Sequence, residues 1–195
     1  NEDFTIKGVR VGKGANSQAG NTVVGETALD ANTSGTSNTA IGKNSLTSNT
    51  SGNQNVAVGL NSLEANTTGG NNIAIGYDAL SSNTTAANNV AVGRLALRDN
   101  ITGTSNTAVG YQTLRDNTSN QNTAVGTSAL SLNTSGNQNT AVGYATLVNN
   151  TTGVNLTAVG SNSAISNTTG NNNTALGMQS LKNNTTGGSN VALGL

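Results

Sequence analysis

The chain has 195 residues, equal numbers of acidic and basic side chains, and no Cys, His, Trp or Pro. Without Cys or His it has no disulfide framework, no zinc site and no pairing of a nucleophile with an imidazole. Zero formal net charge removes the electrostatic case for binding nucleic acid or an anionic membrane. Only 2% of residues are aromatic, so burial must come from many thin layers rather than one thick core.

Residues 1–20 stand outside the pattern that fills the rest of the chain. Their apolar residues alternate with polar ones from Phe4 to Val11 but change parity at Gly8, which predicts a strand with a bend. We expect an N-terminal cap over the first open layer, followed by a short first coil. Because the chain opens on Asn1 without a leader peptide, we also expect it to be a segment of a longer protein.

Residues 21–195 form one repeat region, in which a short motif such as Asn55–Gly59 returns with a fixed period. The equivalent glycines recur at a constant 17-residue step, except that the step from Gly110 to Gly126 is one residue shorter. A period this short predicts stacked supersecondary units. Positions are numbered here from this glycine, so that Asn55 is at −4 and Gly59 at 0. The equivalent glycines are Gly25, Gly42, Gly59, Gly76, Gly93, Gly110, Gly126, Gly143, Gly160, Gly177 and Gly194.

The residues at −4 to −1 predict a β-strand in every unit, because they are mostly β-branched or small and carry no charge. An Ala-Leu-type pair at +3 and +4 predicts a second extended piece. The Asn-Thr-Thr-Gly segment at +7 to +10, as at Asn66–Gly69, predicts a turn whose glycine takes positive φ. Together these features predict an all-β fold, a parallel β-solenoid in which each 17-residue unit makes one coil. Disorder is the alternative for such a polar composition, but the strict phasing of the aliphatic residues argues against it.

Charged residues of the repeat region occur only at +1, +2, +5 and +6. The strand is therefore uncharged on both faces, whereas a thin coil has only one interior. A strand buried on both faces needs a second body, and the simplest one is another copy of the chain. The residues assigned to core or oligomer packing are Ala57, Val58, Ala74, Ile75, Ala91, Val92, Ala108 and Val109.

Asparagine recurs at −4 and at +7. A side-chain amide both donates and accepts, so stacked asparagines in successive coils predict two hydrogen-bonded ladders. The residues assigned to these ladders are Asn38, Asn55, Asn72, Asn89 and Asn106 at −4, and Asn49, Asn66 and Asn83 at +7.

The motifs for chemistry are weak. Carboxylates are scattered, so we expect no enzyme activity, no metal site and no cofactor. Sequons such as Asn66-Thr67-Thr68 follow from the turn and do not predict glycosylation. Tyr77, Tyr111 and Tyr144 all lie at +1 and are candidates for binding a glycan or protein receptor, although they also serve to cover neighbouring aliphatic surface. Threonine columns at −3 and +8 raise ice binding as an alternative, but aliphatic residues interrupt both columns.

The segment Asn72–Ala79 and its copies resemble the head repeat of trimeric autotransporter adhesins, the YadA-like β-roll. The longer 17-residue unit, with its inserted turn, is more similar to repeats of phage tail fibres, as is the opening Ile6–Gly12. The resemblance implies a left-handed roll, an intertwined or side-by-side homotrimer, and an extracellular place on a virion tail fibre or bacterial surface. We therefore expect a structural or adhesive fibre segment, a shaft or head, without membrane or nucleic-acid contact. The alternative is a solenoid that binds ice or a glycan through one face.

Overall fold

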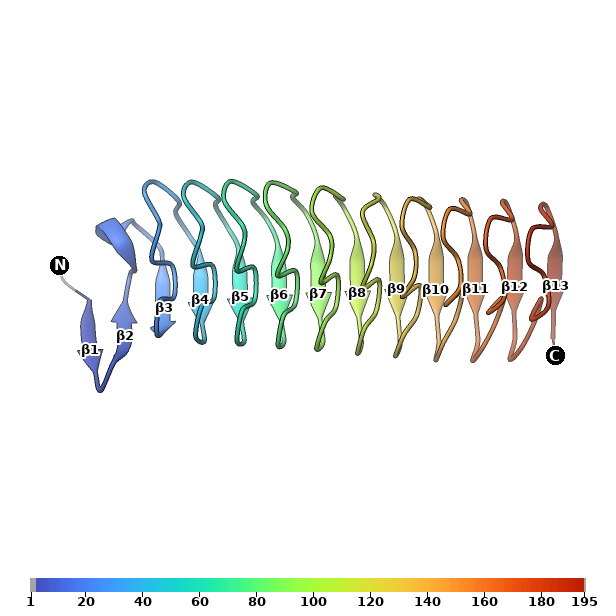
Figure 1. Ribbon diagram of the computed structural model, residues 1–195, viewed down its shortest axis with the longest axis horizontal. Helices are drawn as coiled ribbons and strands as arrows, with labels where there is room; N and C mark the ends of the chain where they lie inside the picture. The colour runs from blue at the N-terminus through green and yellow to red at the C-terminus, as the bar shows by residue number, and fades with distance from the viewer. Residues whose placement is uncertain (1–2, 195) are drawn as a thin grey trace.

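A computed structural model describes residues 3–194, which form a β-solenoid preceded by an N-terminal hairpin (Figure 1). Residues 1, 2 and 195, at the ends of the expected cap and repeat region, lie outside the described residues. Thirteen short strands form one sheet in strict sequence order. From β3 onward every neighbouring pair is parallel and joins equivalent positions of successive units, as in the pairing of Ala57 with Ala74. The predicted all-β solenoid, with roughly 17 residues per coil, is therefore confirmed.

The strands coincide with the predicted segment of each unit, and the one shorter step leaves their register unchanged. Thr107 pairs with Thr123, and Thr123 with Thr140, so the turn around Ser119 absorbs the missing residue. The strands are β1 (Phe4–Ile6), β2 (Val9–Gly12), β3 (Thr22–Gly25), β4 (Thr39–Ile41), β5 (Val56–Val58), β6 (Ile73–Ile75), β7 (Val90–Val92), β8 (Thr107–Val109), β9 (Thr123–Val125), β10 (Thr140–Val142), β11 (Thr157–Val159), β12 (Thr174–Leu176) and β13 (Val191–Leu193), and a 3-10 turn, η1, covers Ala15–Ser17.

From β4 to β12 each strand turns its middle residue into the coil and its two flanking residues outward, because side chains alternate between the faces of a strand. In β5 the side chain of Ala57 is fully buried, while Val56 and Val58 remain partly exposed. The column of leucines at +4, such as Leu63, packs opposite the alanines to complete a thin core. The alanines assigned to packing thus lie inside the coil, and the valines and isoleucines assigned with them lie outside.

The expected second extended piece at +3 and +4 is wrong. Residues +2 and +4 both take left-handed conformations, with φ of 58° at Asn61 and 50° at Leu63. The two turns direct both Ser62 and Leu63 into the coil, where each is fully buried. A left-handed leucine costs roughly 1–2 kcal/mol, but its full burial contributes about 1.5–3 kcal/mol. Its N–H also donates to the carbonyl of Ala79 in the next coil, at 3.0 Å.

The glycine at +10 is required for space and not for positive φ, so the expectation for that turn is also wrong. Gly52 is not in the left-handed region. A Cβ added there would lie 2.3 Å from the carbonyl oxygen of Gly69 and 2.4 Å from Oδ1 of Asn49. The glycine at 0 is restricted by both effects, since Gly59 has a φ of 137° and its Cβ would meet the Gly76 carbonyl at 2.6 Å.

The N-terminal segment is a hairpin and not one bent strand. Lys7 and Gly8 both have positive φ, 49° and 84°, which is the conformation of a two-residue hairpin loop. Strand β2 runs antiparallel to β3, so β2 does not open a short first coil of the repeat. Beside the hairpin, the Asn16 amide donates to the Asn32 carbonyl at 2.6 Å, over the open end of the stack.

Candidate functional site

A long uncharged surface lies on the outward side of the sheet. We call it the outer sheet face and define it as the residues at −3 and −1 of β3–β13, together with Phe4, Ile6, Val9 and Val11. The hairpin residues belong to it because Phe4 pairs with Val11, which in turn pairs with Val24. No charged residue occurs in β3–β13. The face is therefore continuous and uncharged from the first strand to the last.

The −1 column is the most apolar part of this face. Its members are aliphatic in every unit, yet several are 36–40% exposed. Thirteen strands at about 4.8 Å spacing make the face roughly 60 Å long, and three residues make it roughly 10 Å wide. The whole face therefore covers about 600 Å², and the aliphatic −1 column forms a continuous apolar strip along it. The column consists of Val24, Ile41, Val58, Ile75, Val92, Val109, Val125, Val142, Val159, Leu176 and Leu193.

The predicted asparagine ladders are present, but the two columns use different partners. In the −4 column the side chains mostly bond to backbone. Oδ1 of Asn72 accepts the N–H of Asn89 at 3.0 Å, and its Nδ2 donates to the Ala86 carbonyl at 2.9 Å. Each side-chain amide thus links two parts of the chain: the backbone at the start of the next strand, and the backbone of the turn that precedes that strand. Asn38, Asn55, Asn72, Asn89 and Asn106 are all fully buried.

The +7 column is a ladder of side-chain amides. Nδ2 of Asn66 donates to Oδ1 of Asn49, and Nδ2 of Asn83 donates to Oδ1 of Asn66, both at 2.8 Å. Oδ1 of Asn83 is buried without a partner. That coil carries Ala86 in place of glycine at +10, where an added Cβ would meet the asparagine oxygen in the other coils. The extra methyl group therefore explains the break between Asn83 and Asn100, the one break in this ladder within residues 3–194.

A third ladder was missed from the sequence. The threonine hydroxyls at +8 donate to the +8 carbonyl of the next coil, as from Thr50 to Thr67 at 3.0 Å and from Thr134 to Thr151 at 3.0 Å. The signal was the recurrence of threonine directly after the buried asparagine. These hydroxyl protons are engaged within the stack, which weakens the comparison of this column with an ice-binding array. The sequon asparagine Asn66 is fully buried and inaccessible to glycosylation in the folded coil.

The structure brings two of the three candidate tyrosines together with an arginine that the sequence analysis did not single out. The guanidinium carbon of Arg94 lies 5.4 Å from the ring centre of Tyr77 and 5.7 Å from that of Tyr111. All three side chains are exposed. Tyr144 lies two coils beyond Tyr111 and is 61% exposed. The sequence did contain a signal for this cluster. Tyr77, Arg94 and Tyr111 are at +1 in three successive units, and the constant repeat period places such residues next to one another.

The other arginines are held by carboxylates. Arg98 pairs with Asp99 and Arg115 with Asp116, each at 2.5 Å. These hydrogen bonds raise the pKa of both guanidinium groups, and the bond from Arg115 lowers the pKa of Asp116. Across residues 3–194 no group of three or more His, Cys, Asp or Glu side chains is arranged to hold a metal ion. Arg98 and Arg115 therefore form local surface pairs with the aspartates that follow them.

No protein-family model, curated protein or solved structure matches this chain. In the part of the chain that the structure describes, no helix has the length and apolar character needed to cross a membrane. Two surfaces of the molecule are therefore candidates for function: the outer sheet face, and the edge that carries Tyr77, Arg94 and Tyr111 at +1.

Proposed function

We propose that this chain is a non-enzymatic, rigid segment of a surface fibre, a shaft or head, in which copies associate through their outer sheet faces. The observation that carries this proposal is the uncharged outer sheet face from β1 to β13, with its unbroken aliphatic column at −1. A soluble chain that worked alone would gain from polar residues at −1, whereas every unit keeps an aliphatic residue there. Stable interfaces bury about 800 Å² on each partner, and the outer sheet face supplies most of that area.

The interior supports a mechanical role. Two asparagine columns and one threonine column join each coil to the next, in addition to the parallel sheet. Bending the stack would stretch several of these hydrogen bonds at once. Such an assembly holds its length, which suits a segment that projects a binding surface away from a virion or cell.

Three copies are the number implied by the resemblance to trimeric adhesin heads and tail-fibre repeats. A three-fold arrangement would turn the outer sheet faces toward a common axis and leave the charged positions at +1, +2, +5 and +6 outside. The resemblance also supports an extracellular location. The receptor that such a fibre would meet is a host-surface glycan or protein.

Sedimentation equilibrium of the purified chain tests the proposal directly. We expect a stable species with three times the 19.3 kDa mass of one chain, and no dissociation at micromolar concentration. A monomer that stays soluble under these conditions would contradict association through the outer sheet face. Ice binding is tested separately by thermal hysteresis in dilute solution, and we expect none.

A further inference from the structure

We propose that Tyr77, Arg94 and Tyr111 form a binding site for a carboxylated sugar, such as a uronic acid unit of an acidic glycan. We call these three residues the Tyr–Arg–Tyr stack. They occupy the +1 positions of three successive coils. The site goes beyond the proposed structural role and uses none of the residues of the outer sheet face.

The geometry leaves one part of the guanidinium group free. The rings of Tyr77 and Tyr111 lie on opposite sides of Arg94 along the stack, because their coils precede and follow its own. A guanidinium group held between two rings is ordered through its faces and keeps its N–H groups at the edge. Those N–H groups match a carboxylate, which accepts two parallel hydrogen bonds.

Arg94 is also the one arginine that lacks an ion pair within residues 3–194. Arg10, Arg98 and Arg115 each contact an aspartate. The nearby Asp78, at +2 in the Tyr77 coil, already accepts a hydrogen bond from Asn61 at 2.9 Å. An ordered surface arginine without an ion pair is prepared for an external anion, since ordering the side chain is one of the costs of binding.

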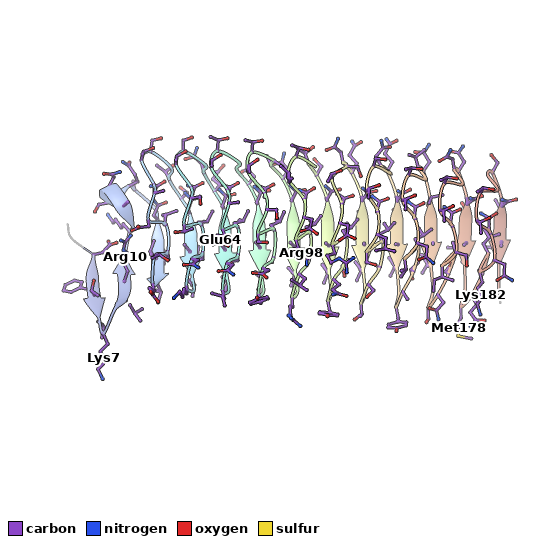
Figure 2. All side chains as sticks on the ribbon, in the orientation of Figure 1. Lys7, Arg10, Glu64, Arg98, Met178 and Lys182 are labelled. Atoms are coloured by element: carbon purple, nitrogen blue, oxygen red, sulfur yellow. The ribbon has the colours of Figure 1, made fainter. Side chains whose placement is uncertain are left out.

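The shape of the surface favours a sugar over a protein partner. The +1 column runs along the edge of the solenoid where each coil turns after its strand, as the position of Met178 shows (Figure 2). From Tyr77 to Tyr111 it spans about 10 Å at the strand spacing and is one side chain wide. A protein interface needs roughly 800 Å² on each side, whereas a linear glycan is itself one residue wide. Tyrosine adds an apolar ring and a hydroxyl group, which fit the two kinds of surface on a pyranose.

Calorimetric titration of the folded chain with tetragalacturonate tests the site. We expect measurable binding at millimolar probe that weakens with added salt. Arg94→Gln should reduce affinity at least tenfold, and Arg94→Lys should reduce it less because the charge remains without the planar fork. Tyr144→Ala is the matched control, because Tyr144 is also a tyrosine at +1 but its neighbours in that column are Thr127 and Ser161, which carry no charge. The affinity of this variant for tetragalacturonate should equal that of the natural chain. An unaltered thermal unfolding curve verifies that each variant is folded.

Several results would overturn the proposal. They are no binding of tetragalacturonate by the natural chain, equal binding of a neutral galactose tetramer, or equal losses for Arg94→Gln and Tyr144→Ala. Tetraglutamate is the last comparison, since equal affinity for it would assign the stack to acidic peptides and not to sugars. The oligomeric state of each sample, measured in parallel, separates failure of this site from failure of the fibre proposal.

Discussion

The inside and the outside of the coils follow opposite rules. Inside, each position accepts almost one residue type: alanine at −2, leucine at +4 and asparagine at −4 and +7. Outside, the +1 column alone includes glutamate, lysine, leucine, tyrosine, arginine and methionine. The interior is restricted by the coil directly above and below, at the spacing of neighbouring strands. The outside is restricted only by what it meets, and its one constant apolar part is the −1 column, which the proposed association between copies would bury.

The strand shows this difference within three residues. An ordinary half-buried strand places large apolar residues inward and polar residues outward. Here the small residue, such as Ala57, points inward and the large one, Val58, points outward. The inner side has little room because the leucine column fills most of it. The outer side carries apolar area that a lone coil would leave in water, and self-association would bury it.

The largest expected effect is on the inside. Ala108→Leu places three extra carbons against the leucine column and the alanines of the two neighbouring coils. We expect it to lower the free energy of unfolding by about 3 kcal/mol or more, measured by urea denaturation. The exposed Ala31→Leu is the control, with an expected change below about 0.5 kcal/mol. Equal losses in the two variants would show that the interior is not the restricted side.

On the outside, Val109→Lys should prevent assembly while leaving each chain folded. A charge in the centre of the outer sheet face would have to be buried between copies, and an unpaired buried charge costs several kcal/mol. Sedimentation should give a monomer with an intact β-sheet circular dichroism spectrum. Thr85→Lys, at an exposed turn, should keep the oligomer. Assembly by both variants would remove the role assigned to this face.

The break in the +7 ladder at Asn83 can be tested by restoring the glycine at +10. Ala86→Gly removes the methyl group beside Asn83, so the free Oδ1 regains a donor from the next asparagine. A satisfied buried acceptor contributes about 1–3 kcal/mol, against roughly 0.4–1 kcal/mol for the added flexibility of glycine in the unfolded chain. We expect a net gain of about 1 kcal/mol in the free energy of unfolding. Ala87→Gly is the control, because it leaves the methyl group of Ala86 in place and should therefore only lower the free energy of unfolding. A higher free energy of unfolding for Ala87→Gly would contradict our explanation of the break.

The smallest effect concerns the outer charges. Arg115 lowers the pKa of Asp116 in the folded chain, so the unfolded chain binds this proton at higher pH than the folded chain does. The resulting stabilisation is present above the ordinary carboxyl pKa, near pH 4. It is lost as the pH falls through the lower folded-state value. For a surface pair we expect at most about 0.5 kcal/mol. Urea denaturation at neutral and acidic pH should give a smaller pH dependence for Asp116→Asn, and an unchanged slope would contradict this assignment.

The sequence alone predicted the period, the strand in each unit, the ladder columns and the positions open to charge. It did so because a fixed repeat stacks equivalent positions on one another. Each position then has nearly the same neighbours in every coil, so its preferred residue type recurs along the chain and can be recognised in the sequence. The same logic placed Tyr77 and Tyr111 in one column, although Arg94 between them was overlooked. The turns were predicted poorly, since a left-handed Leu63 and the hairpin at Lys7 and Gly8 depend on contacts with neighbouring coils.

Only the tertiary structure decided which side of each strand faces inward. Alternation makes −3 and −1 share a face, but it does not say whether that face lines the coil. The answer comes from the turns at +2 and +4, which bring the leucine column against the alanines. Beyond the first coil, where Val23 takes the inward position, every unit has alanine there. The tertiary structure also shows why the residue at +10 is glycine. A side chain there would collide with the asparagine oxygen beside it and with a carbonyl oxygen of the next coil. The residue types favoured at each position determine the repeat, and close packing between coils determines which face of each strand lies inside and which lies outside.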